Sequence, residues 1–189
     1  MALTTLDPIT ALIVIDLQKG IVVYPTVHPA TEIVARAAAL AAAFRRHGLP
    51  VVLVTVAGGA PGRNEQVHRG QNPPGWADLV PELAPQAGDH LVVKRTWGAF
   101  TGTDLEAHLK TLGVTQVVVC GIATSIGVDS TARYAHELGL NVTLAIDAMT
   151  DMSAESHAHS VTRIFPRLGE TGTTQELIAL LDQTRKPRA

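Results

Sequence analysis

The sequence predicts an α/β fold, a doubly wound three-layer α/β/α sandwich built around a mostly parallel sheet. Short β-branched apolar runs recur along the 189 residues, helical stretches lie between them, and none of the runs alternates polar with apolar residues. Continuous apolar strands are typical of parallel sheets, because helices cover both faces of such a sheet. The length suits one domain, and we find no internal repeat. We therefore expect a single domain over residues 1–189, with a flexible tail at about 184–189.

Strands and helices are expected to alternate along the whole chain. The strands are predicted at residues 11–15, 51–56, 91–93, 116–120 and 142–146. The helices are predicted at residues 31–47, 103–112, 126–138, 153–165 and 174–181. Glycines end the first three helices, as is common at a C-terminal cap, and Pro166 is expected to break the fourth. This alternation predicts parallel strands joined by right-handed crossovers.

The segment from Ala57 to Pro85 differs from the rest of the chain. It is rich in Gly, Pro, Asn and Gln, and it is too long for an ordinary connection between two elements. Trp76 and the stretch from Arg63 to Arg69 favour a lid or a subunit contact.

Composition and charge exclude several classes of protein. Lysine and arginine together number 15 and the acidic residues 17, which gives a net charge of −2 and argues against nucleic acid as the partner. No apolar run reaches the ~20 residues that span a bilayer, and the N-terminus lacks the pattern of a signal peptide. The single cysteine, Cys120, fits a reducing compartment. We expect a cytoplasmic protein that acts on a small molecule.

Candidate catalytic residues stand at the predicted strand ends, because ligands of an open parallel sheet bind outside the carboxyl ends of its strands. The first strand ends at Asp16, the third at Lys94, and the fourth at Cys120 followed by the turn GIATSIG. An acid and a base are thus expected at the same edge of the sheet. Position alone leaves a bland alternative open, in which Asp16 caps a turn and Lys94 is a solvated strand-end lysine.

Three segments, ALIVIDLQKGIV, VVKRTWGAFTGTDLE and VVVCGIATSIGVDSTARYAHELGLNVTLAIDAMTD, resemble the isochorismatase-like hydrolases. That superfamily includes nicotinamidases, other amidohydrolases and isochorismatase itself. The resemblance runs in order from about residue 11 to 181. It implies a hydrolase that assembles as a homodimer or homotetramer, with Asp16 and Lys94 as catalytic residues.

Gly127 stands where most of that superfamily carries its nucleophilic cysteine, at the start of the helix after the fourth strand. Glycine has no side chain to attack an acyl carbon, so the usual covalent route is absent. Cys120 lies seven residues earlier and is expected to be a buried packing residue. Ser125 and Ser130 are expected to be a cap and an early-helix serine rather than nucleophiles.

Isochorismatase-type chemistry fits this departure, because hydrolysis of a vinyl ether needs an acid and no thiol. The resemblance then implies Asp16 as general acid, with Lys94 orienting it and balancing negative charge on a small, anionic substrate. One alternative is that Asp16 activates water directly against an amide or ureide. Another is a binding module that has kept the pocket without catalysis.

Residues of the turn and of the loop after the third strand are the candidates for substrate binding. The backbone N–H groups of Ala123 and Gly127 are expected to form an anion site, beside a cis peptide at Ile122–Ala123 that the resemblance implies. Trp97 and Phe100 are expected to wall an apolar pocket, with core packing as the alternative.

Two further expectations concern the surroundings of Asp16. Gln18 is expected to hold Asp16 or a partner backbone, or else to be a turn residue. Gly127 leaves space beside Asp16 for a bulky substrate, or else merely allows close packing of the helix against the sheet.

Neither a metal nor another cofactor is expected. Nicotinamidase-like relatives carry an Asp-x-His group after the second strand, where this chain has residues 55–58, TVAG. His68 alone cannot make a site. His157 and His159 are two apart on a predicted helix and face different directions, so both are expected at the surface. No glycine-rich phosphate loop is present.

Overall fold

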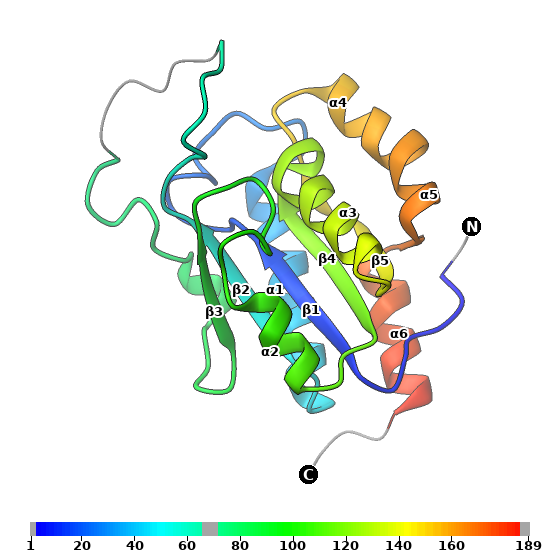
Figure 1. Ribbon diagram of the computed structural model, residues 1–189. Coiled ribbons are helices and arrows are strands. Elements are labelled where there is room, and N and C mark those ends of the chain that lie inside the picture. The colour runs from blue at the N-terminus through cyan, green and yellow to red at the C-terminus, as the bar shows by residue number, and fades with distance from the viewer. Residues whose placement is uncertain (1–2, 66–71, 186–189) are drawn as a thin grey trace.

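A single six-stranded, all-parallel sheet forms the centre of the molecule (Figure 1). The computed structural model describes residues 3–65 and 72–185. Its strands lie in the order β3-β2-β1-β4-β5-β6 and are β1 (Thr10–Ile15), β2 (Val51–Val56), β3 (His90–Lys94), β4 (Gln116–Ile122), β5 (Asn141–Thr150) and β6 (Glu170–Gly172). The strand order reverses between β1 and β4, which defines a doubly wound sheet and its ligand-binding end. The predicted fold class is confirmed.

Helices cover both faces of the sheet. In Figure 1, α2 (Leu105–Thr111) and α3 (Asp129–Glu137) lie in front of it, and α1 (Ala30–Arg46) and α6 (Thr174–Thr184) lie behind it. Shorter pieces complete the chain, namely the 3₁₀ turn η1 (Pro81–Leu83), the π-helical turns η2 (Thr124–Val128) and η3 (Ser160–Ile164), α4 (Ala154–His159) and α5 (Phe165–Leu168).

Alternate residues of the central strands enter two separate cores. On β1, Leu12 and Val14 pack against α1 and α6, whereas Ile13 and Ile15 pack against α2 and α3. Successive strand side chains point to opposite faces, so a strand that is covered on both sides is apolar at most positions on both faces. This burial explains why the sequence shows continuous apolar runs.

The structure corrects the predicted elements in two places. β6 has only three residues, and it was not predicted because such a short strand has no apolar run. The fourth predicted helix does not break at Pro166, because the chain stays helical from Ala154 to Leu168 and includes the π turn η3. Pro166 stands in the first turn of α5, where a missing N–H costs little.

The end of the long segment between β2 and η1, at Trp76 and Asp78, is docked along the chain that leaves β1. The N–H of Lys19 donates to Asp78 O at 2.8 Å, and the N–H of Gly20 donates to Trp76 O at 2.9 Å. Arg69 and His68 lie outside the described residues, as does the predicted tail beyond Arg185, while Thr184 still belongs to α6. The role of this segment as a lid or subunit contact stays a prediction. No helix in the described ranges is long and apolar enough to cross a membrane.

Candidate active site

Asp16 and Lys94 meet at the carboxyl edge of the sheet. Asp16 directly follows β1, and its φ of +52° is a left-handed conformation that is uncommon for residues other than glycine. Lys94 ends β3 and reaches across the end of β2, so that its Nζ lies 2.8 Å from Asp16 Oδ2. Both residues are buried, with 5% and 2% of their surface exposed. The expected convergence of the two strand ends is confirmed, and the catalytic role of the pair stays a prediction.

The ammonium group of Lys94 is held entirely by the protein. Besides Asp16 Oδ2, it donates to Trp97 O at 2.6 Å and to Thr96 O at 3.3 Å. An ammonium has three N–H donors, so all of them have acceptors here. The ammonium thus bonds to Asp16 and to two carbonyls, and the expectation that Lys94 orients Asp16 and balances negative charge on a substrate stays a prediction.

Burial dominates the acidity of Asp16. The pKa of the carboxyl is raised from 3.8 to about 6, because burial raises it by more than the charge and the hydrogen bond of Lys94 lower it. The cause is that leaving water disfavours the charged form of a carboxyl. Asp16 Oδ1 is buried and has no hydrogen-bond partner among the described residues. Buried polar atoms normally have partners, so Oδ1 is an exception that needs an explanation.

Gly127 brings the turn η2 directly against this pair. A Cβ atom on Gly127 would lie 3.3 Å from Asp16 Oδ2 and 3.4 Å from Lys94 Nζ, so the position adjoins both groups. The same Cβ would lie only 2.8 Å from Ile15 Cγ2. The space that was expected beside Gly127 is therefore partly filled by Ile15, and the alternative of close packing between turn and sheet is the one observed.

The chain between β4 and α3 has the predicted cis peptide bond at Ile122–Ala123. Just before this bond, in β4, Gly121 has a φ of +120° and stands where a Cβ would lie 2.0 Å from O of Ile15, its partner on β1. Only glycine suits both the backbone conformation and the contact. That the amides of Ala123 and Gly127 bind an anion stays a prediction.

The surroundings of Gln18 and Phe100 match one of the alternatives expected for each, and substrate binding by Gln18, Trp97 and Phe100 stays a prediction. Gln18 is fully buried and holds backbone rather than Asp16: its Nε2 donates to Val56 O at 3.1 Å, and its Oε1 accepts from Val56 N at 2.7 Å. Phe100 packs in the core and stacks on Tyr134 with ring centroids 5.1 Å apart, which favours the core-packing alternative. The Trp97 side chain is 67% exposed, so its carbonyl is the part that contacts the pair.

Cys120 is the packing residue that was expected. It is fully buried on the α1 side of the sheet, whereas Ile15, which a Cβ on Gly127 would contact, packs on the other side. Burial, with a smaller effect from Asp147, raises the pKa of its thiol to about 12. A thiol that stays protonated and points away from Asp16 is a poor nucleophile.

A polar cluster at the end of β5 was not predicted. The carboxylate of Asp151 accepts from Ser125 N at 2.7 Å and from Ser125 Oγ at 2.8 Å, so it fixes the start of η2. His157 Nδ1 lies 2.8 Å from Thr124 Oγ1, and its ring packs edge-on against His28. Asp151 follows a strand just as Asp16 does, and the same strand-end argument could have identified it.

The surface expectation holds for His159, which is exposed, and is wrong for His157, which is half-buried. Burial and the neighbouring His28 lower the pKa of His157, and Asp151 raises it by less. His157 is therefore a neutral contact of the turn near neutral pH. Within residues 3–65 and 72–185, no three side chains of His, Cys, Asp or Glu gather closely enough to hold a metal ion.

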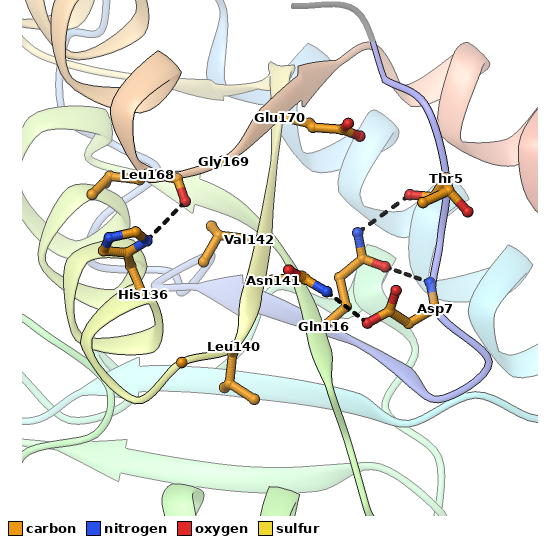
Figure 2. A pocket seen from close by; sticks show the side chains of 11 residues that line it. Thr5, Asp7, Gln116, His136, Leu140, Asn141, Val142, Leu168, Gly169 and Glu170 are labelled. Atoms are coloured by element: carbon orange, nitrogen blue, oxygen red, sulfur yellow. Dashed lines mark hydrogen bonds between the residues drawn. The ribbon is translucent and has the colours of Figure 1, made fainter.

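Two surface cavities lie away from the pair. One of about 390 Å³ lies among the starts of β4, β5 and β6 (Figure 2). Its polar groups are bonded to neighbouring protein atoms, since Asn141 donates to Asp7 and Gln116 donates to Thr5 O. The other, of about 330 Å³, lies between α3 and α4. Neither is lined by Asp16 or Lys94, and the first is at the opposite edge of the sheet from the one where ligands bind in this fold.

Comparisons with known proteins agree with the fold. The isochorismatase domain matches residues 10–176. The chain is 43% identical over 177 residues to an uncharacterized isochorismatase family protein, YwoC of Bacillus subtilis, covering 89% of this chain and 92% of that protein. It is 37% identical over 141 residues to streptothricin hydrolase of Streptomyces noursei, covering 74% of this chain and 49% of that protein. A solved structure of an isochorismatase family protein from Burkholderia thailandensis superposes with a TM-score of 0.90 at 41% identity, covering 94% of this chain and 98% of that one. The chain therefore belongs to the isochorismatase family, whose members are hydrolases.

Proposed function

We propose that this chain hydrolyses a small organic molecule by proton transfer through Asp16, with no covalent intermediate on a cysteine. The observation that supports the proposal is the environment of the Asp16 carboxyl group. Lys94 holds Oδ2 of Asp16, and Oδ1 is buried without a hydrogen-bond partner in residues 3–65 and 72–185. A general acid or base acts best when its pKa lies near the working pH, and the pKa of Asp16 is about 6.

Vinyl ether hydrolysis of the isochorismate type is the reaction that this carboxyl serves most simply. The neutral acid donates its proton to the enol-ether carbon, and water adds to the resulting oxocarbenium ion to give a hemiketal. The bond from the hemiketal carbon to the ether oxygen then breaks, and the hydroxyl proton passes to the leaving oxygen, so that a ketone and an alcohol are released. The proton released by water restores the acid, so no group remains on the enzyme. Lys94 keeps the carboxyl oriented through these steps, because its other two donors are anchored on the carbonyls of Thr96 and Trp97.

The same group can serve as a base on an amide or ureide, and the pH dependence separates the two roles. An acid is active while protonated, so the rate falls as the pH rises through about 6. A base is active while ionised, so the rate rises over the same interval. An anionic substrate would need a binding group other than Lys94, whose donors all have acceptors.

Turnover by matched variants tests the proposal. Wild type, Asp16→Asn and Cys120→Ala would be assayed against isochorismate and a panel of small carboxylated ureides and amides. We expect turnover of one of these by wild type and Cys120→Ala and none by folded Asp16→Asn. Turnover by Asp16→Asn, or loss of turnover when Cys120 is replaced or alkylated, would contradict the assigned roles. Binding of a panel member without turnover by wild type would favour the binding-module alternative.

A further inference from the structure

One hydroxyl group joins the two loops that form the proposed site. Thr131, in the first turn of α3, is fully buried. Its Oγ1 donates to Gly127 O at 2.6 Å and accepts from the backbone N–H of Ala99 at 3.1 Å. The hydroxyl therefore contacts the glycine turn on one side and the loop after β3 on the other.

The loop after β3 is the one that supplies the lysine's carbonyl acceptors. Thr96 O and Trp97 O accept from Lys94, and Ala99 follows two residues after Trp97. Gly98 approaches the same helix so closely that a Cβ there would lie 3.4 Å from Ser130 O. Any movement of this loop away from α3 would carry the two carbonyls, and with them the ammonium, away from Asp16.

Of the two hydrogen bonds of Thr131, the one to Gly127 O is common in helices and the one from Ala99 N is not. A threonine in a helix often donates to the carbonyl four residues earlier, and Thr111 does so in α2, to Ala107 O at 2.9 Å. Thr111 is exposed and accepts no N–H from another segment in the described hydrogen bonds. The bond from Ala99 N is thus the feature that separates Thr131 from a threonine with a purely helical role.

We propose that Thr131 is the positioning residue that sets the geometry of the Asp16–Lys94 pair by fixing the β3 loop to the Gly127 turn. The inference rests on the proposed function of Asp16 and adds a residue that does not touch the reacting atoms. Valine has the shape of threonine but neither accepts nor donates, so Thr131→Val leaves a buried N–H at Ala99 without an acceptor and favours release of the loop. Serine keeps both hydrogen bonds.

The test reads the ion pair directly and requires no substrate. The carboxyl ¹³C resonance of Asp16, assigned with Asp16→Asn, would be titrated in wild type, Thr131→Val, Thr131→Ser and Thr111→Val. Lys94 lowers the pKa of Asp16, so loosening the pair raises it. We expect the midpoint of Thr131→Val to move upward by about one pKa unit, the low end of the effect of a nearby opposite charge. Thr131→Ser and Thr111→Val should titrate as wild type does.

Two results would overturn the proposal. The first is a folded Thr131→Val protein whose Asp16 midpoint equals that of wild type. The second applies even if Thr131→Val fails to fold and comes from amide hydrogen exchange of wild type. The Ala99 N–H should exchange as slowly as the amides of α3, and an Ala99 amide that exchanges at least about a hundredfold faster would mean that the bond to Thr131 is not maintained. Neither readout depends on turnover, so failure of the hydrolase proposal would be seen separately, in the Asp16→Asn assay.

Discussion

Asp16→Asn should gain stability relative to wild type as the pH rises, although we expect the variant to be inactive. The pKa of Asp16 rises from 3.8 to about 6 on folding. Between these values the unfolded chain has lost the proton while the folded chain still holds it, so the stability of wild type falls as the pH rises. Each pKa unit corresponds to about 1.4 kcal/mol, which gives a loss of about 3 kcal/mol that is complete once the pH exceeds about 6. Asparagine cannot ionise and avoids this loss.

Urea denaturation of both proteins from pH 4 to pH 7.5 would measure the effect as the difference in unfolding free energy between Asp16→Asn and wild type. That difference should increase by about 3 kcal/mol up to pH 6 and then level off. The prediction concerns how this difference changes with pH and not its absolute value. The lost contact with Lys94 adds to the difference a constant amount that depends little on pH. Asp182→Asn is the control of opposite sign, since a hydrogen bond from His47 lowers the pKa of Asp182. A flat difference curve for Asp16→Asn would refute the reasoning that burial governs this carboxyl.

Three further predictions concern Lys94, Gly127 and Cys120. Lys94→Met should raise the pKa of Asp16 above about 6, because Lys94 lowers it, and an unchanged or lower ¹³C titration midpoint would contradict the ion pair. Gly127→Cys should destabilise the fold by about 1–3 kcal/mol through overpacking against Ile15 Cγ2. Ile15→Ala should lower the free energy of unfolding by less in the Gly127→Cys protein than in wild type, as measured by a double-mutant cycle in urea. Additive effects of the two substitutions would mean that the two positions do not touch. Cys120, buried and with a pKa of about 12, should resist thiol reagents in the native protein and react fully in urea, and rapid native labelling would count against its place in the core.

The fold could be predicted because the strands of a doubly wound sheet are buried on both faces, which gives them a recognisable apolar sequence. Helices on both faces favour apolar residues at nearly every position of a central strand, and this produced recognisable runs at β1, β2 and β4. β6 could not be found in this way, since its three residues, ETG, carry no apolar run. The helix through Pro166 was missed because the π turn that precedes it has no sequence signal that we used.

Only those parts of the site that are formed by characteristic side chains could be predicted from the sequence. Parallel strands end at one edge, so Asp16 and Lys94 were expected to meet, and their atoms lie 2.8 Å apart. The acceptors that hold Lys94 are backbone carbonyls, which have no residue-specific signature. The exposure of Trp97 and the burial of Phe100 follow from the path of a loop that neither periodicity nor composition determines.

Titration of the Asp16 carboxyl in the wild-type protein by ¹³C NMR tests the central claim most directly, because it asks whether a buried acid beside Lys94 holds its proton toward neutral pH. The arrangement predicts a midpoint of about 6. A midpoint near the ordinary value of 3.8 would mean that the carboxyl is solvated or fully neutralised by Lys94, and Asp16 would then lose its place as the proton-transferring group.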